Sequence, residues 1–252
     1  MSAGRLVSAF LALPVLLVGV AVGVPGAAGE SAPVQASSSA AAGSAVRGRA
    51  LPLRFRTHNA TRVITVTARS HRSTTARLQA WTKASGGGWL ERGKAVIAHV
   101  GSDGVSRHAS EGRGATPVGS FKLLRAFGRK ADPGTRLSYF RTRPSDWWIS
   151  QAGSLYNTHQ RCSSGCQFRQ GSPNEHLYYT TPYYNYAVVI EYNTRYSRTG
   201  VVPGAGSAFF LHVHPAGTGP TAGCVAIGQP KLVRLMRWLR PAAHPRILIG
   251  VG

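Results

Sequence analysis

Acidic residues are scarce in this chain of 252 residues, which has 8 Asp and Glu against 30 Lys and Arg. Between Asp146 and the C-terminus, only Glu175 and Glu191 carry carboxylates. Protein zinc sites are built from imidazoles, thiolates and carboxylates, with three or four of them together. The second half of the chain therefore offers few ligands for a metal, and we predict neither a bound metal nor another cofactor.

Long helical patterns are scarce and internal repeats are absent. Glycine and proline are plentiful, with 30 and 15 residues, and this composition favours β-structure over helix. The length fits one large domain, or one domain with appendages. We therefore predict a mostly β fold with few helices.

The shortage of acids leaves a formal net charge of +22. A surface of this sign attracts polyanions such as nucleic acid, anionic lipid, teichoic-type polymers or carboxylate-rich peptides. A second interpretation is that much of the arginine excess reflects codon usage and serves no partner. Both interpretations stay open at this point.

The first residues have the features of a targeting segment. Arg5 is the only early charge, an apolar run extends from Leu6 to Val24, and small residues up to Ala28 suit cleavage. We predict a signal peptide over residues 1–28, and hence a secreted protein that works outside the cytoplasm. An uncleaved anchor is the alternative, because the apolar run is about long enough to span a bilayer.

The next segment, residues 29–55, is rich in Ala, Ser, Gly and Pro and has few large apolar side chains. Such a composition buries too little surface to fold by itself, so we predict a linker. The folded domain is expected to cover residues 56–252, since no second break in composition follows.

Strand patterns dominate the predicted domain. Alternating polar and apolar residues indicate half-buried strands, and near-continuous apolar runs indicate central strands that are buried on both faces. These patterns occur at residues 62–68, 76–83, 88–101, 186–193, 208–214, 224–228 and 246–252.

One helix is expected, in "PKLVRLMRWLR" at residues 230–240. Four apolar residues recur there at helical spacing and form one stripe: Leu232, Leu235, Met236 and Leu239. Pro230 suits the first turn and Pro241 ends the helix. We expect this helix to pack on the core.

The region from Asp132 to Pro182 has weak periodicity but many aromatic residues. A long irregular stretch inside a domain is usually functional or disordered, and aromatic side chains argue against disorder. We predict that it forms a lid or a wall of a substrate cleft.

The chain has only three cysteines, and each needs an explanation in an oxidising compartment. Cys162 and Cys166 stand four residues apart in "CSSGC", and a turn can close this spacing into a disulfide. A metal site is the alternative for this pair, but no matching second pair exists. A Cys162–Cys166 disulfide leaves Cys224 as the odd thiol, which is intermolecular, merely buried or reactive.

Cys224 follows two histidines in "AFFLHVHPAGTGPTAGCVAIG", residues 208–228. A cysteine nucleophile attacks as the thiolate, so it needs a lowered pKa, an adjacent base or both. His212 ends a predicted strand twelve residues earlier, and the loop between them can bring two strands side by side. Gly223 permits a tight backbone path that exposes the thiol and aims amides at an oxyanion.

Other histidines are also candidates. His212 and His214 share one strand face, so one is the candidate base and the other a binding residue or a structural histidine. The pair could also hold zinc together with Cys224, which would need a further ligand. His176, beside Glu175, is a second candidate for base or binding residue, or else a loop histidine bonded to the backbone.

Three motifs carry a resemblance to a known family. The stretches "ATPVGSF" at 115–121, "GSAFFLHV" at 206–213 and "PTAGCVAI" at 220–227 resemble the L,D-transpeptidase catalytic domain family, also called YkuD-like. The best match is its actinobacterial secreted branch, and "DWW" at 146–148 and "EHL" at 175–177 also look like that branch. The resemblance covers roughly residues 63–252.

The resemblance implies an L,D-transpeptidase-like β-sandwich with a long aromatic-rich loop region over residues 56–252. It implies that Cys224 is the nucleophile and His212 the general base, with the amides of Gly223 and Cys224 as the oxyanion hole. Such enzymes form a thioester with a peptidoglycan stem tetrapeptide and release its terminal D-alanine. They then transfer the thioester to an amine of another stem, which gives a 3–3 crosslink.

The sequence departs from the commoner family pattern in the nucleophile segment. Ala222 replaces a histidine, the interval from the base is shorter, and no Asn or Arg follows "GCVAI". Hydrolysis of the thioester would make the protein an L,D-carboxypeptidase, and a non-catalytic cell-wall-binding module is the alternative of another class. The expected partners are peptidoglycan stem peptides, with anionic cell-wall polymers as further partners and no nucleic acid. The expected location is the cell wall.

Overall fold

The computed structural model describes residues 45–252. The predicted signal peptide and most of the predicted linker lie outside the described residues. The last part of that linker packs on the domain: Leu53 is only 4% exposed, and Arg49 forms a β-bridge with Trp89. Packed structure therefore begins ahead of residue 56.

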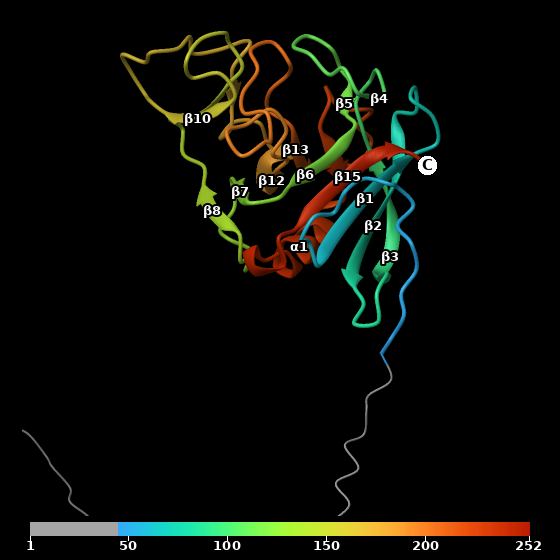
Figure 1. Cartoon of the computed structure of the whole chain (residues 1–252). Coiled ribbons are helices and arrows are strands. Elements are labelled where there is room, and N and C mark those ends of the chain that lie inside the picture. The colour runs from blue at the N-terminus through green and yellow to red at the C-terminus, as the bar shows by residue number, and fades with distance from the viewer. Residues whose placement is uncertain (1–44) are drawn as a thin grey trace, which may run out of the picture. The chain divides into compact units, whose positions relative to one another are not determined.

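A ten-stranded mixed sheet forms most of the domain (Figure 1). In spatial order its strands are β6 (Gly119–Lys122), β15 (Arg246–Val251), β1 (Arg62–Ala68), β2 (Thr75–Lys83), β3 (Trp89–His99), β14 (Val225–Ile227), β13 (Phe210–Val213), β12 (Ala187–Val189), β7 (Arg125–Gly128) and β8 (Ser138–Arg141). The N-terminal and C-terminal strands β1 and β15 lie side by side and run parallel.

Strand β1 of the large sheet contributes side chains to two hydrophobic clusters, one on each of its faces. Ile64 and Val66 of β1 belong to the main core, whereas Val63 faces a smaller cluster with Leu53 and Trp81. Successive side chains point to opposite faces of a strand, and both faces of β1 are covered. Thr65 of β1 is fully buried as well, so this strand is buried on both faces although its sequence alternates between polar and apolar residues.

Two smaller sheets flank the large one. One contains β9 (Asp146–Ile149) between β10 (Thr158–Arg161) and β11 (Glu175–His176), and the other pairs β4 (Val105–Ser106) with β5 (Thr116–Pro117). The buried carboxylate of Asp146 accepts hydrogen bonds from Arg161 and His159 of the neighbouring strand. These charged hydrogen bonds lower the pKa of Asp146 and fasten β10 to β9.

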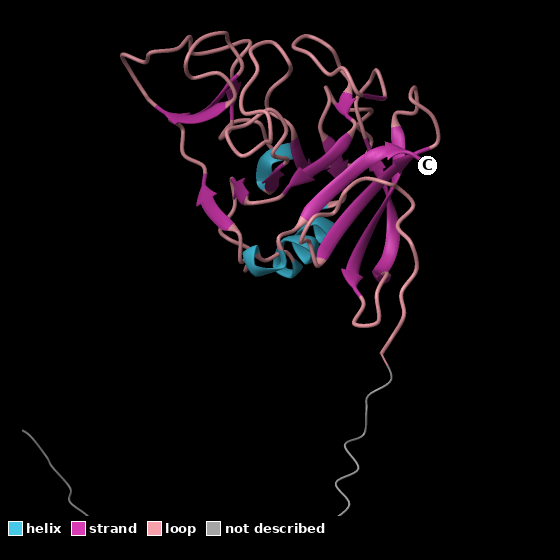
Figure 2. Cartoon of the chain, viewed as in Figure 1, coloured by secondary structure: helices cyan, strands magenta, loops and turns pink. Residues whose placement is uncertain are grey.

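Helices are few, as Figure 2 shows. Within residues 45–252 they are α1 (Gln229–Trp238) and two short 3-10 turns, η1 (Tyr183–Asn185) and η2 (Pro241–Ala243). The apolar stripe of α1 is buried in the main core, as its spacing predicted. The prediction of a mostly β fold with few helices and a long aromatic-rich loop region is thus confirmed. Within residues 45–252, no helix is long and apolar enough to cross a membrane.

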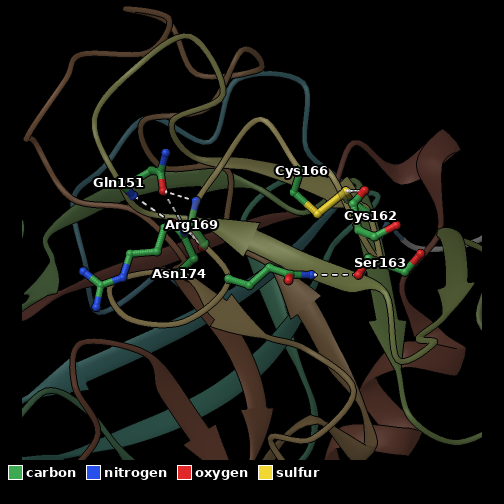
Figure 3. Close-up of a disulfide and its surroundings, with 8 residues drawn as sticks. Gln151, Cys162, Ser163, Cys166, Arg169 and Asn174 are labelled. Atoms are coloured by element: carbon green, nitrogen blue, oxygen red, sulfur yellow. Dashed lines mark hydrogen bonds between the residues drawn. A yellow bond between two sulfur atoms is a disulfide. The ribbon is translucent and has the colours of Figure 1, made fainter.

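The irregular region after β9 is held by side-chain hydrogen bonds and a disulfide (Figure 3). Cys162 and Cys166 are joined, with their Cα atoms 5.7 Å apart. The buried Asn174 amide accepts from the backbone N–H groups of Ser150 and Gln151 and donates to the Arg169 carbonyl. These bonds fix the chain immediately before Glu175.

Replacement of Leu232 by alanine tests the role of α1. Leu232 is fully buried in the main core, so we expect Leu232→Ala to lower the free energy of unfolding by about 2–5 kcal/mol. Arg234→Ala is the matched control, because Arg234 is exposed on the same helix and should change stability by less than about 0.5 kcal/mol. Equal losses in urea unfolding would contradict the assignment of the buried face.

Candidate active site

The parallel pairing of β13 with β14 places Cys224 near His212. His212 of β13 lies beside Ala226 of β14, and two residues earlier the same register sets Cys224 level with Phe210. The Phe210 N–H donates a hydrogen bond to Cys224 Sγ at 3.4 Å. His212 shares its strand face with Phe210 by the period of two, and His212 and Cys224 line the same cavity.

The thiol and the backbone of Cys224 are both held by named contacts. Cys224 is only 9% exposed, and its thiol donates to the Ala208 carbonyl at 3.3 Å. Its own carbonyl accepts hydrogen bonds from the hydroxyls of Thr221, at 2.7 Å, and Thr116, at 3.3 Å. Thr116 belongs to the "TPVG" turn of the sequence, so this motif supports the cysteine from a distant part of the chain.

Gly223 is required for its backbone conformation. Its φ is +129°, and a Cβ would lie 2.8 Å from the Phe209 ring and 3.2 Å from the Ala115 carbonyl oxygen. Its amide donates to the Thr221 hydroxyl at 3.1 Å. The Gly223 amide was one of two predicted oxyanion donors, and its bond to Thr221 already engages it. The other predicted donor, the Cys224 N–H, has no hydrogen-bond partner within residues 45–252.

One ring nitrogen of His212 is bonded to the backbone. His212 Nδ1 lies 2.8 Å from the Val213 carbonyl oxygen, and a carbonyl can only accept, so the neutral ring carries its proton on Nδ1. Nε2 is then the basic nitrogen. The rings of Tyr183 and Tyr184 meet the imidazole at centroid distances of 6.1 and 5.6 Å, nearly perpendicular to it.

Burial makes both groups neutral in the resting protein. It lowers the pKa of His212 to about 4 and raises the pKa of the Cys224 thiol, which the charge of Glu175 raises further. A thiolate–imidazolium pair is thus disfavoured before substrate arrives. A reaction of this thiol would therefore need an adjacent base, because its own pKa is not lowered.

The cavity that holds this pair has a volume of about 670 Å³. One wall comes from the aromatic-rich region, as predicted for a cleft wall, and the other from the loops around β4 and β14. The aromatic-rich region contributes Ser150, Pro173, Glu175, Thr180, Tyr183 and Tyr184.

Glu175 and Tyr184 are functional candidates that the sequence did not single out. The Tyr184 hydroxyl donates to Glu175 Oε2, and Tyr184 is packed between His212 and Phe210. Burial raises the pKa of Glu175 to about 7 and the pKa of Tyr184 well above its usual value. The only signal in the sequence was the scarcity of carboxylates, which makes any acid of this region conspicuous.

His214 lines the same cavity but is engaged elsewhere. Its ring stacks on His99 with centroids 3.6 Å apart, and Nε2 lies within hydrogen-bond distance of the Thr218 hydroxyl and the Gly219 carbonyl. His214 follows the end of β13, and these contacts hold it in the loop. It is a cavity-lining residue that supports the loop before Cys224.

His176 is not brought to the thiol. It neighbours Glu175 on β11, and the alternation of the strand turns its side chain the other way. Its ring stacks on Trp147 at 4.0 Å, and Nε2 donates to the Pro144 carbonyl. The structure therefore gives His176 the backbone-bonded position that was its alternative interpretation.

Neither cysteine of the disulfide lines the cavity, and Cys224 is the only free cysteine of the chain segment from 45 to 252. In the same segment, no three His, Cys, Asp or Glu side chains gather as metal ligands. The site is thus a free thiol, an imidazole and a carboxyl group in one cleft.

A β-rich domain with a buried thiol and an imidazole on paired strands defines a class of cysteine-containing catalytic domains. A family model described as the YkuD L,D-transpeptidase catalytic domain matches residues 74–248. The chain therefore belongs to the YkuD L,D-transpeptidase family, which confirms the resemblance of its motifs. No curated protein and no solved structure matches the chain.

Gly223→Ala tests the strained turn before the cysteine. The added methyl group would collide with Phe209 and force φ out of +129°, so the thiol and the Cys224 amide would both move. We expect labelling of Cys224 by an acylating reagent to slow at least about 100-fold, the usual cost of losing one oxyanion donor. Gly228→Ala, with open space around its Cβ, should label at the wild-type rate; equal slowing in both variants would refute the role.

Glu175→Gln tests the carboxyl group of Glu175 through stability. Because the pKa of Glu175 rises from 4.5 to about 7 on folding, the native state binds more protons between these values and stability falls as the pH rises through them. Glutamine removes this penalty and can still accept from Tyr184. We expect the variant's gain in Tm over wild type to be larger at pH 8 than at pH 4.5, by roughly 2–4 °C or more. An equal gain in Tm at both pH values would contradict the raised pKa of Glu175.

Proposed function

We propose that this L,D-transpeptidase-family protein is a secreted peptidoglycan enzyme in which Cys224 forms a thioester with a stem tetrapeptide. The observation that carries the proposal is the free thiol of Cys224 in a cavity shared with the basic nitrogen of His212. The acyl group is then transferred to an amine, which gives a 3–3 crosslink.

The first step is attack by a thiol that is neutral at rest. Cys224 Sγ bonds to the carbonyl carbon of the third stem residue while its proton passes to His212 Nε2. Charge then appears on the carbonyl oxygen and on the imidazole together, so neither ion has to exist in the buried site before substrate binds. The lowered pKa of His212 keeps the base neutral at physiological pH.

The second step completes acylation. The Cys224 N–H is the candidate donor to the oxyanion, and the bond between Val213 and Nδ1 holds the imidazole in the tautomer that can accept and return a proton. The C–N bond to D-alanine breaks, and the leaving amine takes the proton from His212. The products are the Cys224 thioester and free D-alanine.

The chain's charge suits this substrate and location. Stem peptides carry carboxylates, and anionic polymers share the cell wall, so a net charge of +22 favours association with both. Residues 1–28 have the pattern of a signal peptide, which would deliver the domain to that compartment.

A second outcome of the same site is L,D-carboxypeptidase activity. Ala222 stands beside Cys224 in the cavity wall where the commoner family pattern has histidine, so one expected polar group is missing on the acceptor side. Incubation of the protein with stem tetrapeptides and an amine acceptor separates the outcomes. Crosslinked dimers support transfer, and tripeptides alone support hydrolysis.

Acylation by a carbapenem tests the thiol and its base. We expect wild-type protein to gain the mass of one carbapenem and Cys224→Ala to gain none. His212→Ala should slow adduct formation at neutral pH by about 100-fold or more, because the imidazole base assigned to the thiol is lost. His214→Ala should slow it less, since His214 supports a loop.

Intact-mass spectrometry over time measures these rates. Absence of an adduct on the wild-type protein would reject the enzyme and favour a non-catalytic cell-wall-binding module. Equal slowing in the His212→Ala and His214→Ala variants would reject His212 as the specific base.

A further inference from the structure

The cavity around Cys224 holds two carboxyl groups beside one guanidinium, that of Arg113, although the chain as a whole is strongly basic. Two of the chain's eight acidic residues, Glu111 and Glu175, line it. Glu111 accepts from the Tyr156 hydroxyl at 2.5 Å on the loop side. Glu175 comes from the opposite wall, near the thiol.

Glu175 is held in place by elements on both sides. It pairs with Trp148 in the register of β11 and β9, and the neighbouring Asn174 amide is fixed by hydrogen bonds to Ser150 and Gln151. Tyr184 donates to Oε2. The carboxyl group is therefore preorganised and does not depend on a mobile side chain.

The other oxygen of this carboxyl group is free. Oε1 of Glu175 has no hydrogen-bond partner within residues 45–252, and no Lys, Arg or His of that segment forms a salt bridge with Glu175. Glu175 is only partly buried, so Oε1 is open to the cavity. An ammonium group entering the cavity would supply this carboxylate with a positive charge and hydrogen-bond donors.

The neighbouring thiol makes such a cation useful for catalysis. The charge of Glu175 raises the pKa of Cys224, so the carboxylate opposes a negative sulfur. Cys224 must become a leaving group when the thioester is aminolysed. An ammonium group that pairs with Glu175 and then protonates it removes this repulsion before the sulfur departs.

We propose that Glu175 binds the ammonium group of the acyl acceptor and takes one proton from it, with Tyr184 orienting the carboxylate. The proposal rests on the proposed function and assigns the acceptor side of the site to this residue. It names the acceptor's chemical class: a primary amine that arrives protonated.

The step balances in protons and electrons. The acceptor R–NH₃⁺ gives one proton to the Glu175 carboxylate, and the free amine attacks the thioester carbonyl carbon. The nitrogen loses a second proton to His212 Nε2, the C–S bond breaks, and the sulfur takes that proton back as Cys224 thiol. An amide has formed, and Glu175 returns its proton to solvent. A carboxylate whose pKa is about 7 accepts a proton more readily than an ordinary one.

The test separates acylation from transfer. The donor is a stem tetrapeptide whose side-chain amine is acetylated, so that it cannot act as acceptor. The acceptor is a stem tripeptide with a free side-chain amine. Mass spectrometry follows the rate of acyl-enzyme formation without acceptor, and then the ratio of crosslinked product to hydrolysed product with acceptor.

We expect Glu175→Gln to form the acyl-enzyme within about threefold of the wild-type rate and to lower the ratio of transfer to hydrolysis at least about tenfold. Tyr184→Phe keeps the ring against His212 and removes only the hydroxyl, so the ratio should fall by a smaller factor. Glu91→Gln removes an equal charge from β3 outside the cavity and should leave both quantities unchanged.

Two results would overturn the inference. An unchanged transfer ratio in Glu175→Gln would show that the acceptor does not use this carboxylate. A loss of acylation with an unchanged ratio would assign Glu175 to the donor. Failure of the proposed function looks different, because wild-type protein would then form no acyl-enzyme, or would form it and yield only the hydrolysed product with no crosslinked product.

Discussion

The parallel pairing of β13 with β14 is the constraint on which the site depends. Its register sets Cys224 level with Phe210 and puts His212 on the strand face that borders the same cavity. A shift of one residue would turn His212 into the main core, because side chains alternate between faces. The hydroxyls of Thr116 and Thr221 hold the Cys224 carbonyl and so fix the end of this register.

Burial then determines the protonation states of Cys224 and His212. A buried thiol and a buried imidazole both favour their neutral forms, so catalysis must create charge only when the substrate is present. Glu175 strengthens this condition, because its charge opposes the thiolate. The exterior of the protein is cationic while the cavity carries carboxyl groups, and these two surfaces suit different parts of a peptide that bears both carboxylates and amines.

Contacts between residues that are distant in the sequence hold the aromatic-rich wall of the cavity in place. Glu175 and Tyr184 lie in a region of little regular structure, and the Asn174 hydrogen bonds, the buried Asp146 cluster and the Cys162–Cys166 disulfide order it. Within residues 45–252, none of these groups forms a hydrogen bond with Cys224. They give this loop the fixed geometry that the role proposed for Glu175 requires.

The sequence by itself determined the long strands and the helix, because periodicity is a property of adjacent residues, and the buried stripe around Leu232 follows from it. His212 and Cys224 were candidates from their residue types, and the resemblance to the family selected them over His214 and His176. Only the tertiary structure decided that Glu175 and not His176 faces the cavity and that Tyr184 lines the cavity as well. It also decided that the Gly223 amide donates a hydrogen bond to Thr221. Each of these depends on which way a side chain or amide points within an irregular segment, and such directions are set by packing against residues that are distant in the chain.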